Sequence, residues 1–264
     1  MRRTSLAGFL ILVILGFFCL GTFGLGSGLI QKIEKAKQEL QDGVNTWNAD
    51  KMKHARDLFL NLLMTEESEK AYLHYYTALC DYRLAVYFMA QSATGETGMH
   101  TDNALKHLEE AMNLEPSRGE PYALYASMLG FKVALNPSQG MSLGMEISNY
   151  FGQALAKEPD NPRVNLMKGL SDLYTPEQFG GGLDVAVQSL TKAVDLFETE
   201  MVGNPVEPSW GKEEAYTFLG MVFKKRGDVE KARELFNKAL KVNPEFGLAH
   251  EELSKLEKNK KIRS

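Results

Sequence analysis

The side chains that most often perform chemistry are dispersed along this sequence. The paired carboxylates Glu109 and Glu110 lie in a charged stretch, where solvation accounts for them. Neither cysteine has a histidine partner in a recognisable arrangement. The five histidines are His54, His74, His100, His107 and His250. No two of them have the spacing that would hold a metal ion on one helix face. We therefore expect no enzymatic activity, no cofactor and no metal site.

Tyrosines are concentrated between residues 72 and 87 and again near residue 122. Their spacing places them on two neighbouring faces of a helix, as expected for a helix packed on two sides. Aromatic rings and basic groups can also bind a peptide or a small apolar ligand, so these positions form a candidate groove. Burial in the core is the alternative for the tyrosines, and a solvated surface is the alternative for the basic residues. The candidate groove consists of Tyr72, Tyr75, Tyr76, Tyr82, Arg83, Tyr122, Tyr125, Arg163, Lys224 and Lys225.

The composition is that of an ordinary globular chain, with 44% hydrophobic residues in 264. The formal net charge of −4 gives no overall field that would attract nucleic acid. The two cysteines, Cys19 and Cys80, are too few and too far apart for a disulfide framework. We expect Cys19 to be an apolar residue of a lipid-facing helix and Cys80 to pack in the core.

The N-terminal segment is apolar and predicts a membrane helix. Arg2 and Arg3 are followed by no charged residue until Lys32, and residues 6–25 contain only Thr22 as a polar side chain. Twenty helical residues cover roughly the 30 Å of a bilayer core. The two arginines would keep the N-terminus in the cytoplasm, so that the rest of the chain lies outside it. A cleaved signal sequence is the alternative, and it would leave the protein periplasmic or secreted.

The C-terminal part of the chain contains a helix-pair pattern from Glu213 to Pro244. Its bulky and small residues recur at intervals of three and four, which places them on the facing sides of two helices. Gly227 ends the first helix, and Pro244 stops the second. The pattern resembles the tetratricopeptide repeat, whose signature positions correspond to Tyr216, Leu219, Gly220, Phe223, Gly227, Ala232, Phe236, Ala239 and Pro244.

Four weaker copies of this pattern precede the strong one and occur in order along the chain. The resemblance therefore implies an all-α fold, a right-handed superhelical solenoid of about five helix pairs with a C-terminal capping helix, preceded by an N-terminal hydrophobic helix. The predicted ranges are 1–30 for the anchor or signal, 31–258 for the repeat domain and 259–264 for a basic tail. Within the domain, the repeats are 33–66, 69–116, 119–159, 162–197 and 213–244, with the cap at 246–258.

Three of the repeats contain extra residues between their two helices. We expect these residues to form loops at 91–101, 135–143 and 175–183, gathered on one rim of the array. The third loop contains Phe179, Gly180, Gly181 and Gly182, and we expect Phe179 to pack onto the helix pair. The loop lacks the lysine of a phosphate-binding loop. The rim is either a binding surface or a cover for the core.

The sequence therefore predicts an interaction scaffold for a protein or peptide partner, at the outer face of the cytoplasmic membrane or in the periplasm. The alternative is an accessory solute- or lipid-binding component of an envelope transporter, with an apolar pocket between the tyrosine-rich helices and the rim loops. The glycine-rich loop is loosely similar to one in the T-component of TRAP-type solute transporters, and it is this similarity that suggests the alternative.

Overall fold

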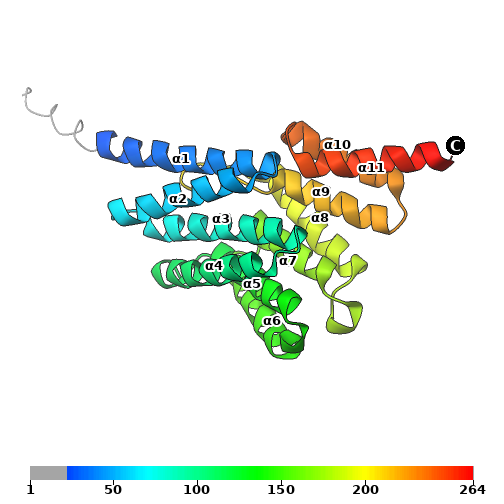
Figure 1. Ribbon diagram of the computed structural model, residues 1–264, viewed down its shortest axis with the longest axis horizontal. Helices are drawn as coiled ribbons and strands as arrows, with labels where there is room; N and C mark the ends of the chain where they lie inside the picture. The colour runs from blue at the N-terminus through cyan, green and yellow to red at the C-terminus, as the bar shows by residue number, and fades with distance from the viewer. Residues whose placement is uncertain (1–22, 264) are drawn as a thin grey trace, which may run out of the picture.

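The computed structural model describes residues 23–263, which form eleven α-helices and two short 3₁₀ helices, with no strand in this range (Figure 1). The first helices of the pairs are α1 (Phe23–Asn45), α3 (Lys70–Ala90), α5 (Glu120–Leu135), α7 (Pro162–Tyr174) and α9 (Lys212–Lys225). The second helices are α2 (Ala49–Thr65), α4 (Thr94–Leu114), α6 (Gly140–Lys157), α8 (Leu183–Thr199) and α10 (Val229–Val242). The last helix, α11 (Gly247–Arg263), packs on α10 and α9.

Each helix packs mainly on its neighbours in sequence, and the first helices of successive pairs contact one another. This arrangement confirms the predicted all-helical solenoid of five pairs with a final helix. The solenoid also closes, because α1 contacts α11. At this junction, the Asn243 side-chain amide donates a hydrogen bond of 2.8 Å to the Asn45 side-chain oxygen. We call the inner face formed by the first helices α1, α3, α5, α7 and α9 the trough.

Small residues permit the close crossing of the two helices in three of the pairs. A Cβ atom on Gly220 would lie 2.6 Å from the Phe236 ring, and one on Gly169 would lie 2.7 Å from the Leu190 side chain. The corresponding distance from Gly43 to Met52 is 2.9 Å. Contacts this short leave no room for a larger side chain, so the glycines set the spacing between the helices.

Side-chain caps and one left-handed glycine define several helix ends. Asn48, Asn161 and Asp228 each accept hydrogen bonds from backbone N–H groups in the first turn of the helix that follows. Gly227 has φ +86°, in the left-handed region that favours glycine, and it allows the tight turn between α9 and α10.

The prediction of a loop is wrong for two of the three rim segments, residues 91–101 and 135–143, because most of their residues are helical. Only residues 91–93 separate α3 from α4, and a short 3₁₀ helix, η1 (Pro137–Gln139), joins α5 to α6. The extra residues lengthen both helices of a pair, so that the added turns still pack against each other. Thr97, His100 and Thr101 are accordingly buried rather than looped out.

The third rim loop is a true loop, and it contains the 3₁₀ helix η2 (Glu177–Phe179). Gly180 and Gly182 have φ of +86° and +109°, and a Cβ on Gly181 would collide with the Thr175 backbone. The expectation that Phe179 packs onto the helix pair is wrong, since its side chain is 71% exposed.

Most of the predicted membrane segment, residues 6–25, lies outside the described residues. Among the helices of residues 23–263, none combines the length and the apolar character that a membrane crossing requires.

Candidate functional site

A segment of the chain itself fills the trough. We call residues 200–211, between α8 and α9, the linker segment. Lys37 on α1 donates hydrogen bonds to the backbone oxygens of Pro205 and Glu207, at 2.9 and 2.7 Å. The Tyr76 hydroxyl on α3 donates one of 2.8 Å to the backbone oxygen of Val206. Side chains of the first two repeats therefore bind the backbone oxygens of a turn from a later part of the chain.

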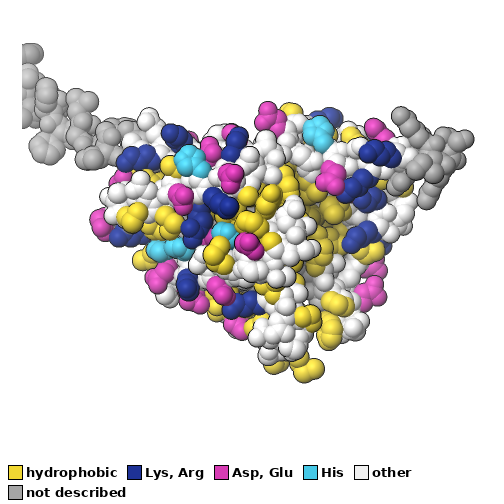
Figure 2. Space-filling view, viewed as in Figure 1, with side chains coloured by type: hydrophobic (Ala, Val, Ile, Leu, Met, Phe, Trp, Pro, Cys, Tyr) yellow, Lys and Arg dark blue, Asp and Glu magenta, His cyan; other side chains and the backbone are white. Residues whose placement is uncertain are grey.

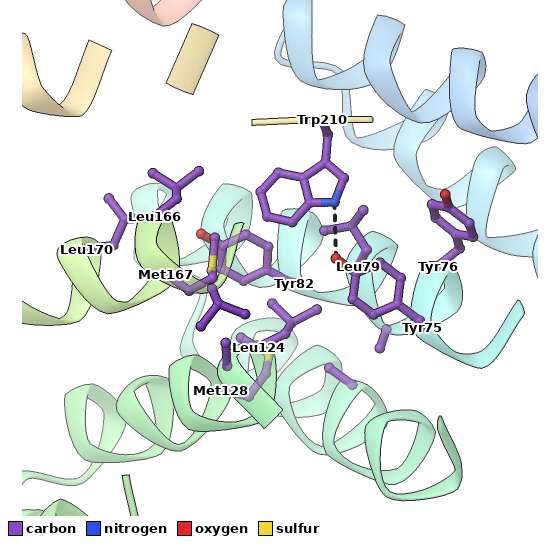
Figure 3. Packing of buried hydrophobic residues seen from close by; sticks show 14 of the residues in the cluster. Tyr75, Tyr76, Leu79, Tyr82, Leu124, Met128, Leu166, Met167, Leu170 and Trp210 are labelled. Atoms are coloured by element: carbon purple, nitrogen blue, oxygen red, sulfur yellow. Dashed lines mark hydrogen bonds between the residues drawn. The ribbon is translucent and has the colours of Figure 1, made fainter. Parts of the chain in front are cut away.

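Trp210 anchors the end of the linker segment in the centre of the trough (Figure 3). Its indole Nε1 donates a hydrogen bond of 3.1 Å to the Tyr75 hydroxyl. The ring lies among apolar side chains from three first helices, which include Leu79 and Tyr82 of α3, Leu124 and Met128 of α5, and Leu166, Met167 and Leu170 of α7.

A buried ion pair joins the second repeat to the fifth beside Trp210. Arg83 on α3 makes two hydrogen bonds to the Glu214 carboxylate on α9, one of them 2.8 Å long. Burial alone would lower the pKa of Arg83, but the adjacent Glu214 carboxylate outweighs it and raises that pKa above its ordinary value. The Arg83 guanidinium carbon also lies 4.8 Å from the centre of the Trp210 ring.

A polar pocket of about 350 Å³ opens near the N-terminal ends of α3, α5 and α7. At its base, Arg163 makes two hydrogen bonds to Glu200, at 2.6 and 3.1 Å, and lies 3.6 Å from Glu120. The Arg118 guanidinium lies 4.0 Å from the centre of the Tyr72 ring. The lining residues are Tyr72, Glu115, Arg118, Glu120, Glu158, Asn161, Arg163, Glu200, Met201, Val202, Glu207 and Pro208.

Hydrogen bonds hold two carboxylates of this pocket, those of Glu120 and Glu158, in position. Asn161 donates to Glu120 at 2.8 Å and to Glu158 at 3.0 Å. The backbone N–H of Glu120 also donates to Glu158, at 3.2 Å. The pKa of Glu158 is raised, first by burial and then by the neighbouring Glu120 charge, although the backbone hydrogen bonds oppose this.

Two further polar clusters lie outside the trough. Asp81 is fully buried and binds both Arg56 and His100, at 2.8 and 2.6 Å. The Nδ1 atoms of His74 and His107 are 2.9 Å apart. The pKa of each of these two histidines is lowered, mainly by burial. Within the part of the chain that the structure describes, no group of three or more potential ligands is placed to hold a metal ion.

The segment from Gly140 to Gly144 reads GMSLG and matches the nucleophile pattern G-x-S-x-G, a match that sequence reasoning missed. That pattern is informative only at a turn from a strand into a helix. Here it opens α6 after a 3₁₀ turn, and Ser142 is exposed with its hydroxyl donating to the Gln139 backbone oxygen. The setting does not support a nucleophile at this serine.

The structure distributes the predicted groove residues over several environments. Tyr75, Tyr76, Tyr82 and Arg83 are buried around the linker segment, while Tyr72 and Arg163 line the polar pocket. Tyr122 and Tyr125 are buried near Tyr150 of α6. Lys224 pairs with Glu252 of α11, and Lys225 is exposed. The groove remains a prediction.

The rim carries an exposed apolar surface. Met141 and Met145 of α6, Tyr174 at the end of α7 and Phe179 in the following loop are all exposed. Figure 2 shows hydrophobic side chains at the lower edge of the molecule, over α6 and the α7–α8 loop. Exposed apolar clusters on soluble surfaces often mark interaction sites.

Sequence reasoning missed the linker segment and most of the polar pocket. A signal was present, because residues 198–212 fit no repeat and contain Pro205, Pro208 and the buried Trp210. A tryptophan in a connection between helices is an anchor more often than a surface residue.

Comparisons with known proteins agree with this geometry. The tetratricopeptide-repeat family pattern matches residues 213–246. The mitochondrial import receptor subunit TOM70 of Homo sapiens is 28% identical over 213 residues, and that of Rattus norvegicus is 26% identical. Each match covers 78% of this chain and 31% of the relative, so the chain matches less than a third of the length of these relatives.

Solved structures share the fold. The HusA haemophore from Porphyromonas gingivalis superposes with a TM-score of 0.59 at 24% identity, covering 78% of this chain and 96% of that one. TTC0263, a thermophilic TPR protein in Thermus thermophilus, superposes with a TM-score of 0.57 at 16% identity, covering 84% of this chain and 98% of that one. The chain therefore contains a tetratricopeptide repeat at residues 213–246 and shares the helical-repeat fold of these structures.

Proposed function

We propose that this protein is a non-enzymatic scaffold that binds a protein or peptide partner. Its N-terminal segment would hold it at the outer face of the cytoplasmic membrane, or direct it to the periplasm. The repeat fold supports a binding role, and the TOM70 relatives are named as import receptor subunits. Stacked helix pairs provide a rigid frame with an extended surface, which suits recognition of a polypeptide.

The observation that carries the proposal is the way in which the trough binds the linker segment. Lys37 and Tyr76 donate hydrogen bonds to three successive backbone oxygens, those of Pro205, Val206 and Glu207. These three oxygens belong to a turn that is closed by a backbone hydrogen bond from Glu207 to Asn204, and the contacts bind this backbone without regard to its side chains. The inner face therefore has the chemistry of a polypeptide receptor, and the linker segment leaves an exposed edge at Met201 beside the polar pocket.

Site-specific photocrosslinking in intact cells tests the proposal. A photoreactive residue at Met201 reports on the trough edge, and one at Phe179 reports on the rim; both side chains are exposed. Met64, which is similarly exposed at the end of α2, is the matched control. A discrete crosslinked protein at Met201 or Phe179, and none at Met64, supports the scaffold. The same weak pattern at all three positions contradicts it.

The location is tested separately. N-terminal sequencing of the mature protein separates a retained anchor from a cleaved signal. Protease added to spheroplasts should then digest the repeat domain, because the arginines before the apolar segment favour a cytoplasmic N-terminus. A repeat domain protected in intact spheroplasts and digested only after lysis would contradict the proposed location.

The second candidate is an accessory solute- or lipid-binding component of an envelope transporter. The polar pocket favours the solute version, because its volume suits a small molecule and its lining is mostly charged. One structure of the same fold is named as a haemophore. Native mass spectrometry separates the candidates: a co-purifying small molecule favours transport, and an unliganded protein that crosslinks to one partner favours the scaffold.

A further inference from the structure

The polar pocket has more negative than positive charge. Its lining contains five carboxylates, those of Glu115, Glu120, Glu158, Glu200 and Glu207, against the guanidiniums of Arg118 and Arg163, so the sum is −3 when all are ionised. Lys37 is the nearby additional cation, but it already donates to two backbone oxygens of the linker segment. Burial is the main cause of the raised pKa of Glu158, and the neighbouring Glu120 charge adds to it.

The same pocket collects hydrogen-bonding atoms that have no partner. Four buried side-chain atoms lack a hydrogen bond among the described residues, and three of them belong to residues that line the pocket. They are Glu120 Oε2, Arg118 Nη1 and Arg163 Nε. Glu120 is 5% exposed and Arg163 is 3% exposed, so solvent does not compensate them. Buried unpaired groups of this kind are rare in native proteins and call for an explanation.

The unpaired atoms specify a complementary ligand. Glu120 Oε2 requires a hydrogen-bond donor. A positively charged donor would also offset the net negative charge of the pocket. Arg118 Nη1 and Arg163 Nε require acceptors. A slight rotation of Glu120 or Arg118 toward the pocket would expose these atoms to a ligand, because Arg118 and Glu120 are held only loosely to each other, with 3.7 Å between Nη2 and Oε2.

The mouth of the pocket is apolar on one side. Met201, Val202 and Pro208 of the linker segment form this wall, and the Met201 side chain is 92% exposed. A long aliphatic side chain with a cationic end fits both features, since its stem packs on apolar surface while its charge reaches the carboxylates.

We infer that this pocket binds the side-chain cation of a lysine or arginine residue, with Glu120 and Glu158 accepting its hydrogen bonds. Arg118 and Arg163 donate to carbonyl oxygens of the same residue. The inference rests on the proposed polypeptide-binding function and names the chemistry of the partner. A free basic amino acid carries the same groups, so the experiment distinguishes the two sources.

The first measurement compares two blocked pentapeptides, Gly-Gly-Lys-Gly-Gly and Gly-Gly-Gln-Gly-Gly, each acetylated and amidated to remove terminal charges. Isothermal titration calorimetry with the full chain in detergent gives both affinities. The lysine peptide should bind at least about tenfold more tightly, as expected for a charged hydrogen bond. Equal affinities overturn the inference.

Variants then locate the binding site. Glu158→Gln, on a half-buried carboxylate, should weaken binding of the lysine peptide by roughly ten- to a hundredfold while leaving the glutamine peptide unaffected. Glu120→Gln should do the same. Glu257→Gln, at an exposed glutamate of α11, is the matched control and should change nothing. A folded Glu158→Gln protein with unchanged affinity for the lysine peptide overturns the inference, whether or not Glu120→Gln folds.

The remaining outcomes separate the sources and separate this inference from the proposed function. Competition by free L-lysine at the affinity of the peptide upholds the pocket chemistry and assigns it to a solute. Much weaker competition assigns it to a polypeptide. If the Met201 crosslink persists in cells while the lysine peptide does not bind, only the pocket inference fails. If the lysine peptide does not bind and neither Met201 nor Phe179 gives a discrete crosslink, the proposed function fails as well.

Discussion

The indole N–H of Trp210 donates a hydrogen bond of 3.1 Å to the hydroxyl of Tyr75, which joins the connection before the fifth repeat to the first helix of the second. Both residues are buried. A solenoid whose repeats touch only their neighbours would leave its inner face open. Here the linker segment and the contact of α1 with α11 close that face, so the array should unfold as one unit rather than repeat by repeat.

Trp210→Ala should therefore destabilise the whole array. Loss of a buried tryptophan costs about 3–5 kcal/mol. Tyr75→Phe removes only the hydroxyl of the pair and should cost about 1 kcal/mol. Met201→Ala, in the same segment but exposed, should stay within about 0.5 kcal/mol of the parent. Urea unfolding followed by circular dichroism measures all three. A Trp210→Ala midpoint equal to that of Met201→Ala would show that the linker segment does not brace the trough.

The ion pair of Arg83 and Glu214 allows a second test of closure. Glu214→Gln leaves the buried guanidinium without its charge partner and should cost about 3–5 kcal/mol. The double variant Arg83→Met with Glu214→Leu removes both charges and should recover most of that loss. The comparison uses urea midpoints of the single and double variants. A double variant that is no more stable than Glu214→Gln would show that the cost does not come from the unpaired charge.

The helix pairs could be predicted from sequence because their signals are local. In the fifth repeat, Gly220 and Phe236 stand within one helix pair, and the spacing of small and bulky residues identifies their facing sides. The extra residues of the second and third repeats misled the prediction, since unmatched residues between two signatures suggest a loop. Their own side chains continue the buried helical face, as Thr97 and Thr101 show.

The position of the linker segment in the trough could not be predicted, because it depends on contacts between residues that are distant in sequence. Tyr75 and Trp210 are separated by 135 positions, and no periodic pattern links them. The linker segment contains Pro205 and Pro208 and reads as a loop, and loops usually lie on the surface. The polar pocket joins three repeats and this loop, so its members are recognisable only once the solenoid is closed.

Gly220→Ala tests the close crossing within the fifth repeat. The added Cβ would lie 2.6 Å from the Phe236 ring, in a core without free space, and such overpacking costs about 1–3 kcal/mol. Gly152→Ala is the matched control, because Gly152 is a helical glycine of α6 with nothing within 4 Å of its added Cβ. It should gain about 0.5–1 kcal/mol from helix propensity. Thermal unfolding compares the two, and opposite shifts of the midpoint are expected; shifts of the same sign would argue against the packing explanation.

The pH dependence of stability should depend on buried carboxyls whose pKa is raised. Glu213 is 6% exposed, and its pKa is raised first by burial and then by Glu214. Glu158 shows the same direction for similar causes. A carboxyl with a raised pKa in the folded protein contributes stability that is fully present below its ordinary value of 4.5 and is lost as pH rises through the folded pKa.

Glu213→Gln should therefore become more stable relative to the parent as pH rises from 4 to 7, since glutamine keeps an oxygen for the 2.9 Å hydrogen bond from Gln41 and has no charge to bury. Glu234→Gln provides the opposite case. Hydrogen bonds from Lys231 and Lys238 lower the pKa of Glu234, so its contribution is present above 4.5 and is lost as pH falls. Urea unfolding at several pH values measures both differences. If the stability difference from the parent changed with pH in the same direction for both variants, burial would not govern the titration of Glu213.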